Sequence, residues 1–393
     1  IEGRADRRRT RRHRYRRTCG CKAVAGIVTA PSPPRLIERG KFGISVWVSV
    51  LLDKFLYGRP SYRLVQDLAD QGLNLSMGTL TGGLRVIAPL FEPVYEALRE
   101  ELRGAEHWHA DETRWAVFVD IEGKRGHRWY LWVFQSRAVA YYVLDASRSA
   151  AVPSAVLAEV DGGTISCDRY GAYKKFARLH PGFTLLFCWA HQRRDLLMLA
   201  NDYPQLASWA LAWVECIGVL FALHAQRREA WLAGRECGEF DRRVRATVQE
   251  MADKREAALA DPTLPAPAAK VLKSMRRHWA GLTAFLDRPE RALDNNEAER
   301  ALRSAVVGRK NFYGSGSQWS GQLAAMMFSV LMSLRLWQVN PRTWLSAYLQ
   351  ACAENANRPP DLAAFLPWRM DAARLAALRT APAFTQPPGV DTS

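Results

Sequence analysis

At about residue 107 the hydrophobic pattern of the chain changes from the period of a helix to the period of β-strands. Three runs rich in β-branched and aromatic residues follow, and a turn at 122–126 separates the first two. A short helix, a strand, a second helix and a last strand come next. This order predicts an α+β or α/β fold whose mixed sheet is a three-strand meander plus two further strands, with helices packed on it. The expected strands are residues 115–119, 127–135, 139–144, 163–167 and 184–188.

Two acidic residues lie next to the expected strands. Asp111 precedes the first strand, and Asp168 directly follows the strand at 163–167. The element order is that of a ribonuclease-H-like core, in which the first and fourth strands lie side by side and bring these carboxylates together. Neighbouring carboxylates repel one another unless cations neutralise them. Two Mg²⁺ or Mn²⁺ ions, about 3.5–4 Å apart, suit such a site and promote phosphodiester displacement.

A third acid is expected on a helix after the last strand. The sequence LDNNEAER supplies it, since Asp294 or Asn295 can cap a helix that presents Glu299. Glu297 is the rival acid, on a different face of the same helix. Taken alone, each acid has an ordinary structural explanation, a turn cap or an ion pair, so the prediction rests on the placement of all three.

The regions around this sheet are predicted to be helical. An amphipathic helix at 61–71, a break at Gly72 and a cap at Ser76 give the outline of a helix-turn-helix, or of an ordinary helical hairpin. About a hundred residues after Arg194 have a helical pattern, with a Pro-rich break at 262–267. The expected segments are a basic arm (1–41), an N-terminal helical domain (42–104), the first part of a catalytic domain (105–194), an all-helical insertion (195–293), a catalytic helix with C-terminal helices (294–366) and a tail (367–393).

The chain is strongly basic, because 55 Lys and Arg against 39 Asp and Glu give a formal net charge of +16. Ten basic residues and two acids fall within residues 1–25, so this segment contributes +8. Such a run commonly lies along the phosphates of nucleic acid, and the alternative is a solvated tail. A Gly-rich segment at 308–317 is expected to be a flexible loop that follows a DNA strand end. The expected DNA-binding side chains are Arg8, Arg12, Arg16, Arg193, Arg194, Arg300, Arg303, Arg309 and Lys310.

The seven Cys residues are odd in number and scattered, which favours a reducing cytoplasm and no disulfide framework. Cys19 and Cys21, with His13 nearby, offer only three of the four ligands of a zinc site, so zinc is not expected there. No P-loop spacing is present, and no nucleotide cofactor is expected. The most apolar stretch, 323–337, is interrupted by Arg335 and is too short to span a bilayer, so no membrane association is expected.

Several motifs make the chain similar to a known family. They are HADETRW (109–115), CWAHQRRD (188–195), and DNNEAERALR (294–303) followed by GRKN (308–311). The basic arm at 14–36, with its Cys pair and APSPPR, and the segment 52–79 also match. On these residues the chain resembles the insertion sequence 66 transposase family over nearly its whole length, to about Leu366. The pairing of NNxxER with GRKN is highly specific for that family.

The resemblance implies a DDE transposase that acts on the inverted-repeat ends of double-stranded DNA. Asp111 and Asp168 would carry two Mg²⁺ or Mn²⁺ ions, and the matching motif places the third acid at Glu299 rather than Glu297. The resemblance also implies a helical insertion between the last strand and the helix that carries Glu299. This agrees with the spacing of the acids, because Glu299 follows Asp168 by 131 positions, whereas Asp168 follows Asp111 by 57. Family members usually carry further sequence upstream and a fuller zinc knuckle, so we expect this chain to be incomplete at its N-terminus.

The expected reaction is hydrolysis that exposes a 3′ hydroxyl at each transposon end, followed by transfer of that end into target DNA. A homo-oligomer on DNA, accessory proteins of the same element and a nucleoid-associated location in the bacterial cytoplasm are expected with it. Similar Cys-x-x-His pairs follow the last strand in other DDE transposases, so His191 is a candidate for positioning DNA or a carboxylate, and an ordinary structural role is the alternative. The rival functions are a catalytically idle DNA-binding remnant and a nuclease of the same fold without strand transfer.

Overall fold

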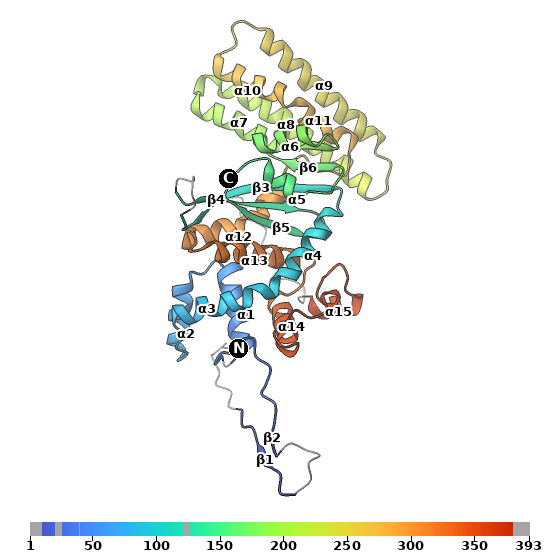
Figure 1. Cartoon of the computed structure of the whole chain (residues 1–393). Coiled ribbons are helices and arrows are strands. Elements are labelled where there is room, and N and C mark those ends of the chain that lie inside the picture. The colour runs from blue at the N-terminus through green and yellow to red at the C-terminus, as the bar shows by residue number, and fades with distance from the viewer. Residues whose placement is uncertain (1–9, 20–25, 39, 121–125, 380–393) are drawn as a thin grey trace. The chain divides into compact units, whose positions relative to one another are not determined.

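The computed structural model of the chain describes residues 10–19, 26–38, 40–120 and 126–379 (Figure 1). Its internal contacts divide the chain into two units, each assembled from separate stretches of sequence. The sheet unit comprises residues 99–115 and 128–303, and the helical unit comprises residues 1–98, 116–127 and 304–393. Every acidic residue of the predicted catalytic set belongs to the sheet unit.

The sheet unit is built on a mixed β-sheet with the strand order β5-β4-β3-β6-β7. Strands β4 and β5 pair antiparallel, whereas β6 lies parallel to both β3 and β7. The predicted mixed sheet is therefore confirmed, and its order is compatible with a ribonuclease-H-like core. The strands are β3 (His107–Val117), β4 (Arg128–Gln135), β5 (Ala140–Asp145), β6 (Gly163–Cys167) and β7 (Phe183–Phe187).

The first strand of the sheet is longer than the sequence predicted. It was expected at 115–119, but β3 begins at His107 and contains Asp111 within it. Side chains alternate between the two faces of a strand, and Trp108, Ala110 and Glu112 are all buried while their neighbours are partly exposed. The polar residues at 109 and 111–113 concealed this alternation, because the prediction relied on runs of strand formers.

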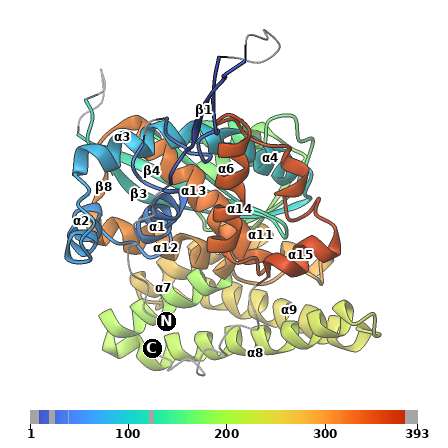
Figure 2. The same cartoon turned by 90° about the horizontal axis from the view of Figure 1, so that it is seen from below.

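Helices cover the sheet and form the predicted insertion after β7. Helices α8 and α9 run side by side in Figure 2, and α8 also packs against α7. Part of the insertion core is formed by Leu199, Leu206, Ala210 and Ala268. The Pro-rich break predicted at 262–267 falls between α9 and α10, except that Pro267 lies in the first turn of α10. The helices are α5 (Ala151–Val156), α6 (Gly171–Leu179), α7 (Trp189–Asp202), α8 (Ala207–Leu232), α9 (Gly238–Ala260), α10 (Ala266–Arg277), α11 (Trp279–Thr283) and α12 (Asn296–Phe312), of which residues up to 303 belong to this unit.

Among the described residues, one helical stretch, Pro204–Leu232, is long and apolar enough to cross a membrane by length and composition alone. The apolar stretch that the sequence singled out, 323–337, instead lies largely in the buried helix α13 (Gln318–Leu336). Helix α8 packs against α7 and α9, and the core helix of a soluble protein passes the same test. A single helix of this kind is therefore weak evidence for a membrane span.

The helical unit confirms the helix, break and cap predicted near residue 72. Gly72 has φ +81°, and the Ser76 side chain accepts a hydrogen bond from the Thr79 amide at 3.1 Å. Whether this helix pair binds DNA stays a prediction. The elements are β1 (Arg14–Arg16), β2 (Ile27–Thr29), α1 (Ile44–Phe55), α2 (Ser61–Asp70), α3 (Met77–Ile87), α4 (Glu92–Arg103, which begins in this unit), β8 (Gly314–Ser315), α13, α14 (Pro341–Glu354) and α15 (Ala372–Leu378).

The segment 308–317 is not the flexible loop that its glycines suggested. Its first part continues helix α12 to Phe312, and Gly314 and Ser315 then form β8, which pairs in parallel with Ala116 and Val117 of β3. A Cβ atom at Gly314 would lie 2.1 Å from the Ala116 carbonyl oxygen, so the glycine permits the two strands to approach. Glycine here serves a close backbone contact rather than mobility.

Two adjacent glycines of α3 should respond in opposite ways to alanine. A Cβ atom at Gly83 would lie 2.0 Å from the buried Trp47 ring, whereas nothing lies within 4 Å of one at Gly82. We expect Gly83→Ala to destabilise the helical unit by about 1–3 kcal/mol or more through overpacking. Gly82→Ala should stabilise it by about 0.5–1 kcal/mol through helix propensity. Urea unfolding of both variants checks the prediction, which fails if the two shifts have the same sign.

Candidate active site

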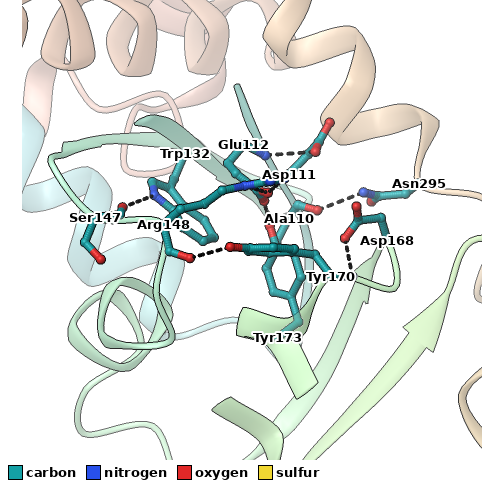
Figure 3. A network of polar contacts seen from close by, with 10 residues as sticks. All are labelled: Ala110, Asp111, Glu112, Trp132, Ser147, Arg148, Asp168, Tyr170, Tyr173 and Asn295. Atoms are coloured by element: carbon teal, nitrogen blue, oxygen red, sulfur yellow. Dashed lines mark hydrogen bonds and ion pairs between the residues drawn. The ribbon is translucent and has the colours of Figure 1, made fainter. Parts of the chain in front are cut away.

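Asp111 and Asp168 lie on neighbouring parallel strands. The register of β3 on β6 pairs His107 with Thr164 and His109 with Ser166. Continued by two residues, this register sets Asp111 level with Asp168, which follows the last residue of β6. Figure 3 shows the two carboxyl groups close to each other, with Asn295 beside them. The sheet topology thus brings together the two acids that the sequence singled out.

The carboxyl group of Asp111 is the most perturbed of the acids. It accepts a hydrogen bond from the Glu112 amide at 2.8 Å. Burial raises its pKa to about 7, and the charges of Glu112, Asp168 and Glu299 add to the increase. Asp168 accepts a hydrogen bond from the Tyr170 amide at 2.8 Å. Without a cation, Asp111 therefore retains a proton up to nearly neutral pH.

Asn295 fastens the start of α12 to β3. The side chain is buried; its Nδ2 donates to the Ala110 carbonyl at 2.8 Å, and its Oδ1 lies 3.1 Å from His109 Nδ1. The backbone amide of Asn295 donates to Cys188 Sγ at 3.3 Å. Of the two residues expected to cap this helix, Asp294 accepts a hydrogen bond from the Asn296 amide at 3.1 Å. Asn295 instead connects three segments of the chain, a role that sequence analysis missed.

Glu299 and Glu297 face different surroundings. Glu299 is one of the charges that raise the Asp111 pKa, and its Oε1 lies 3.9 Å from His191 Nδ1 on α7. Glu297 accepts a hydrogen bond from Gln135 at 3.3 Å and forms an ion pair with Arg300 at 2.6 Å. These contacts group Glu299, rather than its rival, with the acids of β3 and β6.

The opposite face of β3 carries a buried ion pair that sequence analysis also missed. Glu112 accepts a hydrogen bond from the Tyr173 hydroxyl at 2.6 Å and two from the Arg148 guanidinium group (Figure 3). Burial raises the pKa of Glu112, while these donors act against the increase. The Arg148 side chain also lies over the ring of Tyr170, which is two residues after Asp168. In the sequence, the only sign that Glu112 faces inward is the strand alternation, in which residues 108, 110 and 112 lie on one face and Asp111 lies on the other.

The predicted basic residues fall into several regions of the chain. Arg193 and Arg194 are exposed on α7 and line a cavity of about 420 Å³ together with Asp294 and Asn296. Arg300 and Arg303 are exposed on α12 in the same unit, whereas Arg309 and Lys310 belong to the helical unit. Arg12 and Arg16 are exposed in the N-terminal arm, where β1 and β2 form a short antiparallel ribbon. Arg8 and Cys21 lie outside the described residues.

The perturbed Asp111 carboxyl group predicts an unusual pH dependence of stability. Its pKa is about 7 in the folded chain and close to the ordinary 3.8 in the unfolded chain, so between these values the folded state binds more protons. In EDTA, stability should therefore fall as the pH rises from about 4 to 7. Asp111→Asn should remove this loss and raise the Tm at pH 8 by several degrees, with little change at pH 4.

Thermal melts at both pH values check this, with the exposed Asp161→Asn as the matched control. An equal response of the wild type and Asp111→Asn to pH would show that Asp111 is not perturbed by its neighbours.

Comparison with known proteins identifies the family. The chain belongs to the transposase IS66 family, whose model matches residues 39–323. It is also similar to proteins of Sinorhizobium fredii (strain NBRC 101917 / NGR234). The uncharacterized protein y4jD is 29% identical, over 93% of this chain and 73% of that relative. The uncharacterized protein y4hP is 27% identical, over 92% of this chain and 68% of that relative. The resemblance seen in the sequence motifs is confirmed.

Proposed function

We propose that this chain is a DDE-type DNA transposase with a ribonuclease-H-like core, which cuts the ends of its element and joins them to target DNA. The observation that carries the proposal is the gathering of three carboxyl groups from separate segments. Asp111 lies within β3, Asp168 follows β6, and Glu299 lies on α12 and adds to the raised pKa of Asp111. Membership of a transposase family supports DNA as the substrate.

The three side chains fit a pair of hard divalent cations. All are carboxylates, which Mg²⁺ and Mn²⁺ prefer, and burial, with the neighbouring acidic charges, raises the pKa of Asp111 to about 7, an increase that a bound cation would oppose. When bound, such ions activate the attacking hydroxyl and neutralise charge on the leaving oxygen. Asp111 and Asp168 would hold them, and Glu299 would complete the set. An all-carboxylate ligand set is the reason to propose Mg²⁺ or Mn²⁺ as the ions of this site.

Other residues of the sheet unit would position the DNA. Arg193 and Arg194 line a cavity that also contains Asp294 and Asn296, just before and at the start of α12. Their guanidinium groups can bind phosphates bidentately and set a DNA end against the acids. Asn295 holds the start of α12 on β3 and so fixes the distance of Glu299 from Asp111. In the first reaction water is the nucleophile, and in the second the new 3′ hydroxyl attacks the target strand.

The test uses DNA fragments that flank the coding sequence of the chain, with unrelated DNA of equal length as the control. Cleavage that needs Mg²⁺ or Mn²⁺, stops in EDTA, and is followed by joined end–target products supports the proposal. Salt-sensitive DNA binding without cleavage would instead support an idle DNA-binding protein. Cleavage without joined products would support a nuclease. Gel filtration with the same DNA tests the expected homo-oligomer, and added proteins of the element test the need for accessory factors.

A further inference from the structure

Three side chains of different chemistry meet between α7 and α12. Cys188 immediately precedes α7, His191 lies in its first turn, and Glu299 lies in the first turn of α12. Their ligand atoms, the cysteine sulfur, a histidine nitrogen and a carboxylate oxygen, all lie within 4.8 Å of one another. Two segments separated by more than a hundred residues thus supply one compact group of donors.

The histidine Nδ1 of this group has no hydrogen-bond partner, and the cysteine sulfur is bound only by backbone amides among the described residues. His191 Nδ1 is buried, has no hydrogen-bond partner among the described residues, and lies 3.9 Å from Glu299 Oε1, too far for a hydrogen bond. Cys188 is a buried free thiol, whose sulfur accepts the Asn295 amide at 3.3 Å and also backbone hydrogen bonds from Ala190 and His191, a pattern that a metal-bound thiolate can keep. A buried nitrogen without a partner costs free energy unless something binds it. Both groups are therefore available to a ligand that takes sulfur, nitrogen and oxygen together.

We propose that Cys188, His191 and Glu299 form a zinc site. This site differs from the carboxylate site of Asp111 and Asp168, and Glu299 is the one residue common to both. Zn²⁺ accepts thiolate, imidazole and carboxylate ligands in a tetrahedral arrangement and can leave the fourth position to water. Bond lengths of about 2.0–2.3 Å require ligand atoms roughly 3.3–3.6 Å apart, so a small closure of the observed group is enough. A thiolate and a carboxylate also balance the charge of the ion. Mg²⁺, which prefers oxygen, does not suit this donor set.

The shared glutamate gives the site a consequence for the reaction, and this part rests on the proposed function. While zinc holds the Glu299 carboxylate beside His191, that carboxylate cannot complete the divalent-cation site that Asp111 and Asp168 would form. Zinc should therefore inhibit cleavage that depends on Mg²⁺, and its inhibition should disappear when Cys188 or His191 is replaced. The zinc site itself does not depend on the chain being a transposase.

Cobalt(II) binding tests the site directly. The full chain is used with Cys19→Ser and Cys21→Ser, so that no cysteine of the N-terminal arm can contribute to the signal. We expect one equivalent of Co²⁺ to produce the thiolate-to-cobalt absorption of a tetrahedral site, and Zn²⁺ to displace it. Cys188→Ser should abolish the band, and His191→Ala should weaken binding at least tenfold. Cys237→Ser is the matched cysteine control, and Asp111→Asn should keep the band because Asp111 is not a ligand.

The outcomes separate this site from the proposed function. A band that survives Cys188→Ser, or no binding by a folded protein, overturns the zinc site whether or not DNA is cut. A cobalt band that is lost in Cys188→Ser supports the site even if no cleavage is found. If cleavage occurs, the ratio of rates with and without zinc is compared for the parent and His191→Ala. Equal inhibition of both would overturn the control of Glu299 by zinc.

Discussion

Asp168→Asn is expected to reduce DNA end cleavage by roughly a thousandfold or more, equal to about 4 kcal/mol of transition-state stabilisation. The change removes the negative charge that would hold a divalent cation but keeps the size of the side chain. The oxygen that accepts the Tyr170 amide is also retained, so the fold should survive. Asp111→Asn should have an effect of the same order for the same reason. Cleavage rates at saturating Mg²⁺, with DNA binding measured in parallel, check both variants.

The two glutamates of α12 provide a matched pair for the third acid. Glu299→Gln should reduce cleavage about as strongly as the aspartate variants, because Glu299 is among the charges that act on Asp111. Glu297→Gln should change it only a few-fold, because that side chain is bound by Gln135 and Arg300. The reverse order of effects would assign the third acid to Glu297. Normal cleavage by the Asp111, Asp168 and Glu299 variants would show that these acids do not carry the reaction.

Much of the sheet could be predicted because its strands are rich in strand formers and end at clear breaks. The strand at 163–167 agrees with β6 at both ends, and β4 begins one residue later than expected. The start of β3 could not be predicted in the same way. Its inward face includes Glu112, whose charge is offset by Arg148, a partner 36 residues away that no local pattern reveals. Long-range pairing, not propensity, makes that segment a strand.

The candidate site was predictable in its acids but not in its supports. Acids beside strands and at the start of a helix mark Asp111, Asp168 and Glu299, and the family resemblance chose between Glu299 and Glu297. Asn295 was visible only as one of two helix caps, because its contact with Ala110 spans 185 residues. Asp294 accepts the Asn296 amide locally, whereas the carbonyl to which Asn295 donates belongs to β3, so the role of Asn295 is known only once the helix is placed against that strand.

Asn295→Ala is also expected to have a large effect, although Asn295 is not one of the acids. The asparagine donates to the Ala110 carbonyl at 2.8 Å, and its Oδ1 lies 3.1 Å from His109 Nδ1. Both partners belong to β3 and lie within two residues of Asp111. Alanine would leave the buried carbonyl without this donor, at a cost of about 1–3 kcal/mol in stability. It would also free the start of α12, and a shift of about 1 Å in a catalytic group can reduce the rate about a hundredfold. We expect a loss of that size in cleavage and unchanged DNA binding.

Two comparisons distinguish positioning from a general loss of stability. Gly83→Ala is expected to lower the stability of the helical unit. At temperatures well below its Tm this variant should still cleave DNA. Asn295→Ala should not cleave normally even at the same temperature difference below its own Tm. Asn295→Ala should also need more Mg²⁺ for half-maximal cleavage, because Glu299 would no longer be held near Asp111. Asn296→Ala, one residue further along, should leave stability within about 0.5 kcal/mol. If Gly83→Ala and Asn295→Ala lose cleavage equally, with the same Mg²⁺ requirement as the wild type, Asn295 stabilises the fold but does not position Glu299.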